Sequence, residues 1–311
     1  MSDKLHLSVS PHIHTNKTVQ GIMLDVIIAL MPPAVAGVII FGARAFFIIS
    51  VCVFSCVMGE FIFNKIVKKE QSVSDLSAVV TGLILGMNLP YIVPIWQAII
   101  GSLFAIVIVK CFFGGLGCNI VNPAATARVF MLISFGSLAK NALPQGMDAV
   151  SGATPLSQIA SGESPGLVKL LIGNHGGTIG ETCAIAILIG GVYLLSRKII
   201  TIHIPLAYVG TTFVFYLLTD NFNFTIATAG ILSGGLLFAA FFMATDYVTS
   251  PATSLGKVVY GVLAGIITVV IRKWGVYPEG VSFAILLLNI LNPYIESLTA
   301  RRVFGGEKYE N

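Results

Sequence analysis

The chain has 311 residues, of which 56% are hydrophobic and only 10% are charged, and its formal net charge is +4. Soluble domains carry about 25% charged residues, so this composition excludes a water-soluble globular domain, a disordered chain and a nucleic-acid-binding protein. With a mean hydropathy of +0.90, the chain is expected to be an all-α polytopic protein in contact with membrane lipid.

Apolar runs along the chain predict about ten transmembrane helices in a single integral membrane domain that covers residues 1–311. A helix that spans a bilayer needs about 20 residues, and several runs are shorter because they end at Pro or follow Gly-rich breaks. The polar segment 136–165 lies between the fifth and sixth runs. The ten runs are 22–41, 45–63, 76–89, 92–109, 122–135, 179–195, 199–218, 226–244, 258–271 and 281–294.

Lys and Arg residues predict the orientation of these helices, because basic loops stay in the cytoplasm. If the N-terminus is cytoplasmic, the inner flanks collect twelve of the 18 basic residues, Lys110 among them, and the rest of the chain holds six. This count predicts that the N-terminal segment 1–21, the loop with Lys65, Lys68 and Lys69, and the C-terminus are cytoplasmic. The segment 136–165 is then an external loop.

Two interruptions of the apolar runs predict broken helices, and each carries a similar motif. Asn122-Pro-Ala-Ala-Thr126 and Ser250-Pro-Ala-Thr-Ser254 both place Pro at an expected helix start, where its missing N–H costs nothing. The motifs lie four crossings apart, which would make them parallel, whereas two five-helix halves would be inverted, as in many transporters. The motifs alone do not decide between these arrangements.

Broken backbone at membrane depth must line a cavity or be shielded by protein. We therefore expect the breaks at 114–123 and 246–251 to approach each other and to hold a ligand or part of an ion path. The competing interpretation is that glycines such as Gly115 and Gly117 only allow close helix packing. Ser233-Gly234-Gly235 is expected to lie inside a continuous apolar helix for that reason.

The segment Asp148-Ala-Val-Ser151-Gly152-Ala153-Thr154-Pro155 is the most specific signal in the external loop. Small residues precede the hydroxyl of Thr154, and Pro155 favours an extended backbone at Thr154. Such a segment presents one hydroxyl to a modifying enzyme. Without further information, the residues alone favour an ordinary turn.

Asp-x-x-Ser-Gly-Ala-Thr resembles the acceptor motif of bacterial flavin transferases, and four further stretches resemble signatures of one membrane family. That family comprises RnfD, a component of the Rnf ion-translocating oxidoreductase complex, and NqrB, a component of the sodium-pumping NADH:quinone reductase. NqrB normally carries a longer N-terminal extension than the about 21 residues found here, which favours the Rnf component. The four stretches are LSAVVTGLILG (76–86), GGLGCNIVNPA (114–124), GGTIGET (176–182) and FMATDYVTSP (242–251).

The resemblance implies that FMN is joined through its phosphate to the Thr154 hydroxyl, with Asp148, Ser151, Gly152 and Ala153 as the recognition motif of a flavin transferase. A second flavin, riboflavin, would be held non-covalently near the intramembrane breaks. The implied partners are the other Rnf subunits, including an outer flavin subunit.

The implied function is electron transfer coupled to Na⁺ or H⁺ transport across the bacterial cell membrane. The implied fold is a urea-channel-like bundle, which makes a passive channel for small solutes the rival function. A channel has no use for the acceptor motif.

Charged residues within or beside the apolar runs are the remaining candidates, because such residues are costly in a bilayer. Asp25, Glu60, Glu181 and Asp246 either lie at the water interface or belong to an ion path or a partner contact. Arg128 either binds the flavin phosphate or pairs with other groups to pin its half-length helix.

The five cysteines, Cys52, Cys56, Cys111, Cys118 and Cys183, are expected to act as small packing residues. No metal ligand set and no catalytic residue is assigned from the sequence.

Overall fold

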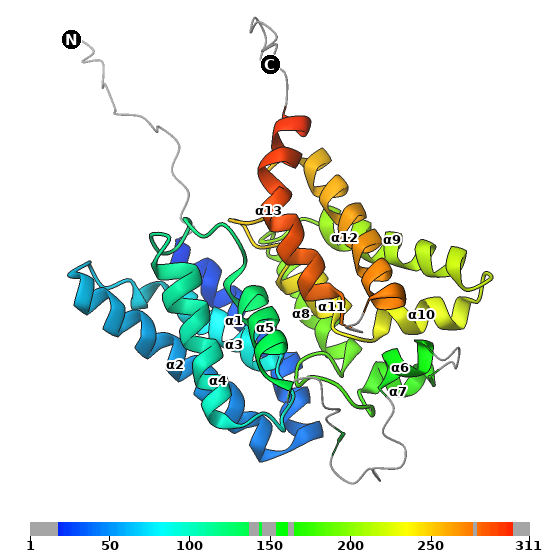
Figure 1. Cartoon of the computed structure of the whole chain (residues 1–311), viewed down its shortest axis with the longest axis horizontal. Coiled ribbons are helices and arrows are strands. Elements are labelled where there is room, and N and C mark those ends of the chain that lie inside the picture. The colour runs from blue at the N-terminus through cyan, green and yellow to red at the C-terminus, as the bar shows by residue number, and fades with distance from the viewer. Residues whose placement is uncertain (1–17, 137–142, 145–153, 161–164, 276–278, 301–311) are drawn as a thin grey trace, which may run out of the picture.

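In the computed structural model, the described residues are 18–136, 143–144, 154–160, 165–275 and 279–300, and in these ranges the chain is helical without any strand. Figure 1 shows the helices assembled into one bundle. The helices are α1 (Val19–Phe41), α2 (Ala43–Val67), the 3₁₀ turn η1 (Val73–Asp75), α3 (Ser77–Met87), α4 (Ile95–Leu103), the π-helical segment η2 (Phe104–Cys111), α5 (Pro123–Ser134), α6 (Pro155–Ala160), α7 (Leu167–Ile172), α8 (Ala184–Ser196), α9 (His203–Thr219), α10 (Phe224–Leu232), α11 (Leu236–Phe242), α12 (Ser254–Trp274) and α13 (Val281–Thr299).

Each of the ten predicted apolar runs has a helical counterpart. By length and composition, α1, α2, α12 and α13 can each cross a membrane, and α10 with α11 forms one more candidate span that is bent. The other five runs correspond to the shorter apolar helices α3, α4 with η2, α5, α8 and α9. The prediction of an all-α polytopic membrane protein with broken helices is confirmed.

The bundle consists of two halves, α1 to α5 and α8 to α13. The N-terminal end of α1 and the C-terminal end of α13 lie on one side, whereas α6 and α7, which connect the halves, lie on the other (Figure 1). The chain therefore passes from the first of these sides to the second through the first half and returns through the second half. We refer to these two faces of the bundle as the terminal side and the connecting side.

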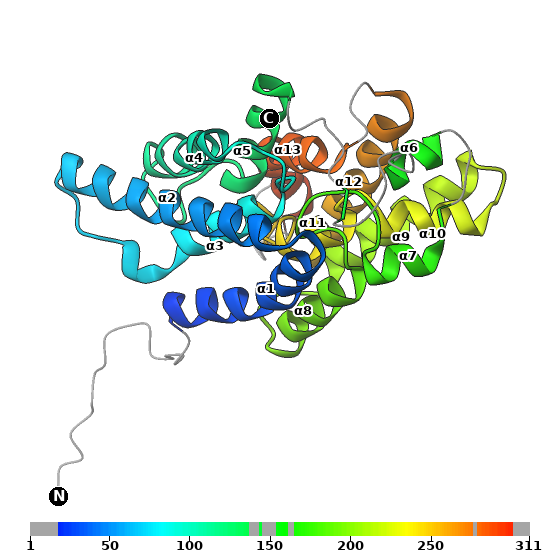
Figure 2. The ribbon, with the colours of Figure 1, turned by 90° about the horizontal axis from the view of Figure 1, so that it is seen from below.

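Packing between and within the halves follows a two-fold relation. The halves meet where α1 packs against α8 and α5 against α13, so each of these elements contacts its own counterpart. Within each half, the second element packs against the third and the fourth: α2 against α3 and α4, and α9 against α10, α11 and α12. Figure 2 shows α2 along one edge of the bundle and α9 and α10 along the opposite edge. These contacts and the course of the chain agree with inverted halves, one of the two arrangements that the sequence left open.

The similarity between the motifs at 122–126 and 250–254 is unrelated to this two-fold relation. The first motif begins α5, the fifth element of its half, whereas the second precedes α12, the fourth element of the other half. In addition, Pro123 is the first residue of α5, but Pro251 lies before Thr253, the N-cap of α12. The prediction that both motifs begin a helix with Pro is therefore wrong for the second one.

The expectation of a continuous helix through Ser233-Gly234-Gly235 is wrong. The helix breaks there, and α10 and α11 are inclined by 54°. Gly234 and Gly235 have φ angles of +66° and +69°, a conformation that other L-residues adopt only at an energetic cost. Two consecutive glycines therefore bend the chain at this point and do more than allow close packing.

Candidate functional site

The two predicted breaks line one cavity on the terminal side of the bundle, as expected from the sequence. Its volume is about 110 Å³. The first break contributes Leu116, Asn119 and Asn122, and the second contributes Asp246 and Tyr247. Apolar side chains of α1, α3 and α8 complete the walls, so a few polar groups face a mostly apolar space, which is the usual composition of a ligand site.

Asn122 fixes the first break and connects it to the second. Its side-chain oxygen accepts hydrogen bonds from the backbone N–H groups of Ala124 and Ala125, both at 3.1 Å, and thereby caps α5. Its amide nitrogen donates to the carbonyl oxygen of Met243 at 3.3 Å. One side chain thus satisfies backbone groups of both broken segments, which would be costly to leave unpaired in a bilayer.

The glycines of the first break are needed for backbone conformation and not for close packing. Gly115 and Gly117 have φ angles of +107° and +88°, and a Cβ atom at either position would have no atom within 4 Å. The interpretation that they only let helices approach each other is therefore wrong. They let the chain turn from η2 towards Asn122.

The second break is held by contacts with itself and with α13. The Thr249 hydroxyl donates to the Asp246 carboxylate at 3.1 Å. The backbone N–H of Ala252 donates to the carboxylate of Glu296 at 2.9 Å, and the hydroxyl groups of Thr253 and Thr299 are 3.0 Å apart. The end of α13 therefore positions the segment that carries Asp246 at the cavity.

A buried ion pair adjoins the cavity. Glu60 and Lys110 are only 1% and 2% exposed, and Lys110 Nζ is 2.9 Å from Glu60 Oε2. Lys110 belongs to η2, and π-helical turns are frequent at functional sites. Of the two alternatives for Glu60, solvation at the water interface is wrong, and so is the expectation that Lys110 serves as a basic flank residue, because both side chains lie inside the protein and form an ion pair.

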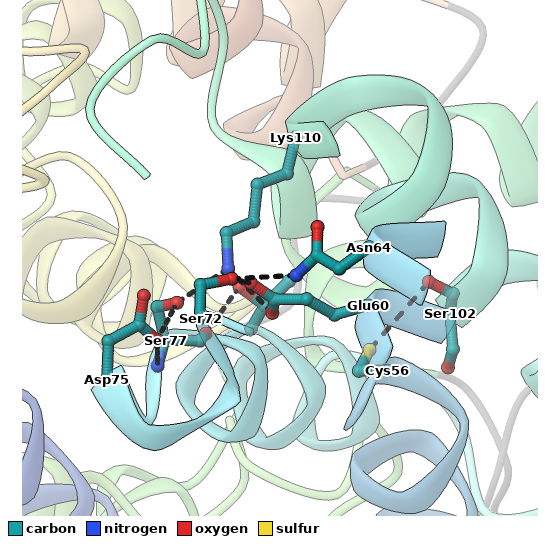
Figure 3. Close-up of polar contacts among 9 residues, drawn as sticks. Cys56, Glu60, Asn64, Ser72, Asp75, Ser77, Ser102 and Lys110 are labelled. Atoms are coloured by element: carbon teal, nitrogen blue, oxygen red, sulfur yellow. Dashed lines mark hydrogen bonds and ion pairs between the residues drawn. The ribbon is translucent and has the colours of Figure 1, made fainter. Parts of the chain in front are cut away.

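Hydroxyl and amide groups extend this pair into a network (Figure 3). Lys110 Nζ donates to Ser77 Oγ, and Ser77 Oγ donates to Asp75 Oδ1, both at 2.5 Å. Ser72 Oγ donates to Glu60 Oε1 at 2.5 Å. Lys110 and Ser77 also line the cavity, so the polar network forms one part of its wall.

The other charged candidates differ in their surroundings. Asp25 accepts a hydrogen bond from the Tyr193 hydroxyl at 2.9 Å and pairs with Arg197, whose side chain is 58% exposed. This is the interfacial placement that was one of the two alternatives. Glu181, by contrast, is buried in the loop between α7 and α8.

Of the acceptor motif, Thr154 lies within the described part of the chain, whereas Asp148, Ser151, Gly152 and Ala153 lie outside it. Thr154 directly precedes α6 on the connecting side (Figure 1). Its Oγ1 accepts a hydrogen bond from the backbone N–H of Ser157 at 3.3 Å and donates to Ser157 Oγ at 3.2 Å. A phosphoester on this oxygen would keep the first bond and lose only the second, so the site is compatible with attachment of FMN.

Arg128 lies within α5 and is 1% exposed. Its Nη2 is 2.5 Å from the carboxylate of Glu279, in the loop that precedes α13. This contact corresponds to the alternative in which Arg128 pins its short helix. Binding of a flavin phosphate by Arg128 stays a prediction.

Three features of the structure were missed by reasoning from the sequence. Arg272 was not singled out, but it donates to the carbonyl oxygens of Gly230, Ser233 and Gly234 at 2.7–3.0 Å and holds the break between α10 and α11. Glu279 was not considered as the partner of Arg128, nor Lys110 as that of Glu60. A Gly-Gly pair inside an apolar run was the available signal for the additional break.

No group of three or more His, Cys, Asp or Glu side chains is arranged to hold a metal ion in the part of the chain that the structure describes. Cys52, Cys56 and Cys111 are buried, as expected of packing residues, whereas Cys118 is exposed.

The chain is similar to one family of membrane proteins over almost its whole length. The family model described as the NQR2, RnfD, RnfE family matches residues 6–305. The D subunit of the Na⁺-translocating ferredoxin:NAD⁺ oxidoreductase complex of Acetobacterium woodii is 43% identical, and the match covers 98% of this chain and 96% of that protein.

Two other relatives have comparable coverage. The D subunit of the proton-translocating ferredoxin:NAD⁺ oxidoreductase complex of Clostridium ljungdahlii is 37% identical, with 96% of each chain covered. The D subunit of the ion-translocating oxidoreductase complex of Aeromonas salmonicida is 31% identical, with 97% of this chain and 99% of the relative covered.

Proposed function

The chain belongs to the NQR2, RnfD, RnfE family, and we propose that it is the membrane subunit of an Rnf-type complex that transfers electrons through FMN attached to Thr154. Electron flow through the complex would drive Na⁺ or H⁺ across the bacterial cell membrane. The protein acts with its partner subunits and is not catalytic alone. When bound, FMN supplies the redox chemistry, and the protein supplies position and electrostatics.

The observation that carries this proposal is the hydroxyl of Thr154 at the end of an Asp-x-x-Ser-Gly-Ala-Thr sequence. Its hydrogen bonds are made with Ser157, three residues further along the chain, so modification need not disturb the helical bundle. The position before α6, on the connecting side, suits a residue that a separate flavin transferase must reach. The other recognition residues, Asp148 to Ala153, belong to the same segment.

The charge distribution supports an external position for this attachment site. Lys65, Lys68 and Lys69 lie at or just beyond the C-terminal end of α2, whose other end adjoins the end of α1. We propose that the terminal side, with both termini and these lysines, is cytoplasmic and that Thr154 is external. An outer flavin subunit of the complex would then have direct access to the flavin on Thr154.

The cavity between the breaks is proposed to belong to the ion-translocating part of the protein. Its volume of about 110 Å³ can hold several water molecules, with Asp246, Asn119 and Lys110 in the lining. Pockets that enclose drug-sized ligands measure about 300–1,000 Å³. Riboflavin would therefore enter only if the walls of the cavity moved, and an ion with its water is the better fit.

Thr154→Val tests the attachment directly, because it removes the oxygen and keeps the shape of the side chain. The variant and a flavin transferase are co-expressed, and in-gel flavin fluorescence of the denatured protein is measured. Fluorescence should disappear, while the amount of membrane-inserted protein stays unchanged.

Thr225→Val is the matched control, because Thr225 is exposed and also lies near a helix start but lacks the acceptor motif. It should retain full fluorescence. Undiminished fluorescence of the Thr154→Val protein would overturn the assignment.

A further inference from the structure

A second group of charged residues, none of which lines the cavity, comes from α5 and from the loops before α8 and α13. Arg128 of α5, Glu181 of the loop between α7 and α8, and Glu279 of the loop before α13 make up this group, which we call the carboxylate cluster. Glu181 and Arg128 are buried, and the Glu279 side chain is 26% exposed. The group therefore reaches from the interior to the surface through Glu279.

Among the described residues, Arg128 forms an ion pair with Glu279, whereas the buried Glu181 carboxylate forms none. Arg128 Nη2 forms the ion pair with the Glu279 carboxylate, and the buried Arg128 Nη1 has no hydrogen-bond partner among the described residues. Glu181 Oε1 accepts a hydrogen bond from the backbone N–H of Thr178 at 2.9 Å. Because burial disfavours charge and like charges repel, an ionised Glu181 without a paired cation and near the Glu279 carboxylate is unfavourable here.

The space around the Glu181 carboxylate is shaped by glycines. A Cβ atom at Gly177 would lie 2.7 Å from Glu181 Oε1, and one at Gly235 would lie 2.9 Å from Oε2. Gly235 belongs to the break between α10 and α11. Only residues without a side chain leave this room for the carboxylate, so the break and the loop of Glu181 together form its binding space.

The other charged or titratable groups considered near Glu181, Arg272 and His175, have backbone carbonyl oxygens as their hydrogen-bond partners. Arg272 of α12 donates to three carbonyl oxygens of the break. The two ring nitrogens of His175 lie 3.0 Å from the carbonyl oxygen of Gly176 and 3.1 Å from that of Thr182. Glu279 and Arg128 are thus the charged groups that can respond to a change in the ionisation of Glu181.

We propose that Glu181 is a proton-binding site, with Arg128 as its counter-charge. While Glu181 is protonated, Arg128 pairs with Glu279 alone, and when Glu181 is ionised, a side-chain movement brings its carboxylate to the unpaired Nη1. The bound species is a proton taken from or released to water at Glu279. The proposal concerns residues of this chain and does not depend on a flavin at Thr154. It gives the protein a site for proton exchange distinct from the cavity that Asp246 lines.

The pKa of Glu181 agrees with such a site. Burial is the largest cause that raises this pKa to about 7, and the neighbouring Glu279 carboxylate acts in the same direction, whereas the bond from Thr178 and the charge of Arg128 act in the opposite one. Glu181 is then protonated below about pH 7 and ionised above it. An unperturbed glutamate, with a pKa of about 4.3, would be ionised throughout this range.

Infrared difference spectroscopy of the purified, oxidised complex over a pH series tests the proposal, because a protonated carboxyl has a separate C=O stretching band. We expect one such band to titrate with a midpoint near pH 7 and to be absent in Glu181→Gln. Glu296→Gln is the matched control, since Glu296 also accepts a backbone N–H bond, and it should leave this band in place. A band that persists in Glu181→Gln overturns the proposal.

Glu279→Gln provides a second, independent measurement if Glu181→Gln does not assemble. Removal of the like charge should lower the midpoint of the Glu181 band, and an unchanged midpoint would contradict the proposal. The Thr154→Val complex should show the same titration as the unmodified sequence. A missing covalent flavin would thus count against the proposed attachment, whereas a missing band counts against the proton site.

Discussion

Replacement of Lys110 by Met should be among the most destabilising changes in this protein, and the structure explains the size of the effect. The substitution keeps the apolar stem but removes the cation 2.9 Å from Glu60 Oε2. Glu60 is 1% exposed and would retain the hydrogen bond from Ser72. Removal of one partner of a buried ion pair costs about 3–5 kcal/mol, because the remaining charge is left without compensation.

A second substitution should recover much of this loss. In the double variant that combines Lys110→Met with Glu60→Gln, the buried site is neutral, and the side-chain amide oxygen introduced at position 60 can still accept the bond from Ser72. We expect the double variant to be more stable than Lys110→Met alone, by about 2 kcal/mol, since neutral replacements of buried pairs cost little. The free energy of unfolding is measured by denaturant titration of the purified protein in detergent.

The matched control is Lys65→Met, because Lys65 is an exposed lysine of α2. It should change the free energy of unfolding by less than about 0.5 kcal/mol. The account of the buried pair is refuted if Lys110→Met and Lys65→Met have similar stability, or if the losses of Lys110→Met and Glu60→Gln simply add in the double variant.

Two further predictions concern the break between α10 and α11 and the orientation of the bundle. Arg272→Met should lower the free energy of unfolding by at least about 3 kcal/mol, because three carbonyl oxygens lose a charged donor. The control Lys273→Met loses a partly exposed ion pair with Asp220 and should lower it by about 1 kcal/mol or less. Equal losses in a denaturant titration would contradict the role assigned to Arg272. The orientation is tested with Lys68→Cys and Ser151→Cys, each in a protein whose native cysteines are replaced. On intact cells, a membrane-impermeant thiol reagent should label the Ser151→Cys protein and leave the Lys68→Cys protein unlabelled. The reverse pattern would contradict the proposed orientation.

The sequence was sufficient to predict the class of fold, because apolar length is the physical requirement of a bilayer-spanning helix. Each apolar run became a helix or a helix pair, and Asn122 with Pro123 correctly marked the start of α5. The boundary at 179–195 was less accurate, since Ile179 is apolar yet lies in the loop that precedes α8. Hydropathy reports burial in an apolar environment and does not distinguish a buried loop from a helix.

The polar contacts of the site were not predictable from the sequence, because they join residues far apart in the chain. Glu60 and Lys110 are separated by 50 positions and Arg128 and Glu279 by 151. Each residue alone looked like an interfacial charge or a helix anchor. Only the packing of α2 against η2, and of α5 against α13, brings opposite charges together.

Mass spectrometric mapping of the flavin in the purified complex tests the central claim most directly. The protein is digested with a protease, and the peptide that contains residues 148–154 is analysed for the mass of FMN less one water and for the modified side chain. The account predicts FMN on Thr154, in a phosphoester bond, in the sequence Asp148-Ala-Val-Ser-Gly-Ala-Thr154. An unmodified Thr154 in a complex that is active in electron transfer, or covalent flavin on another residue, would contradict it.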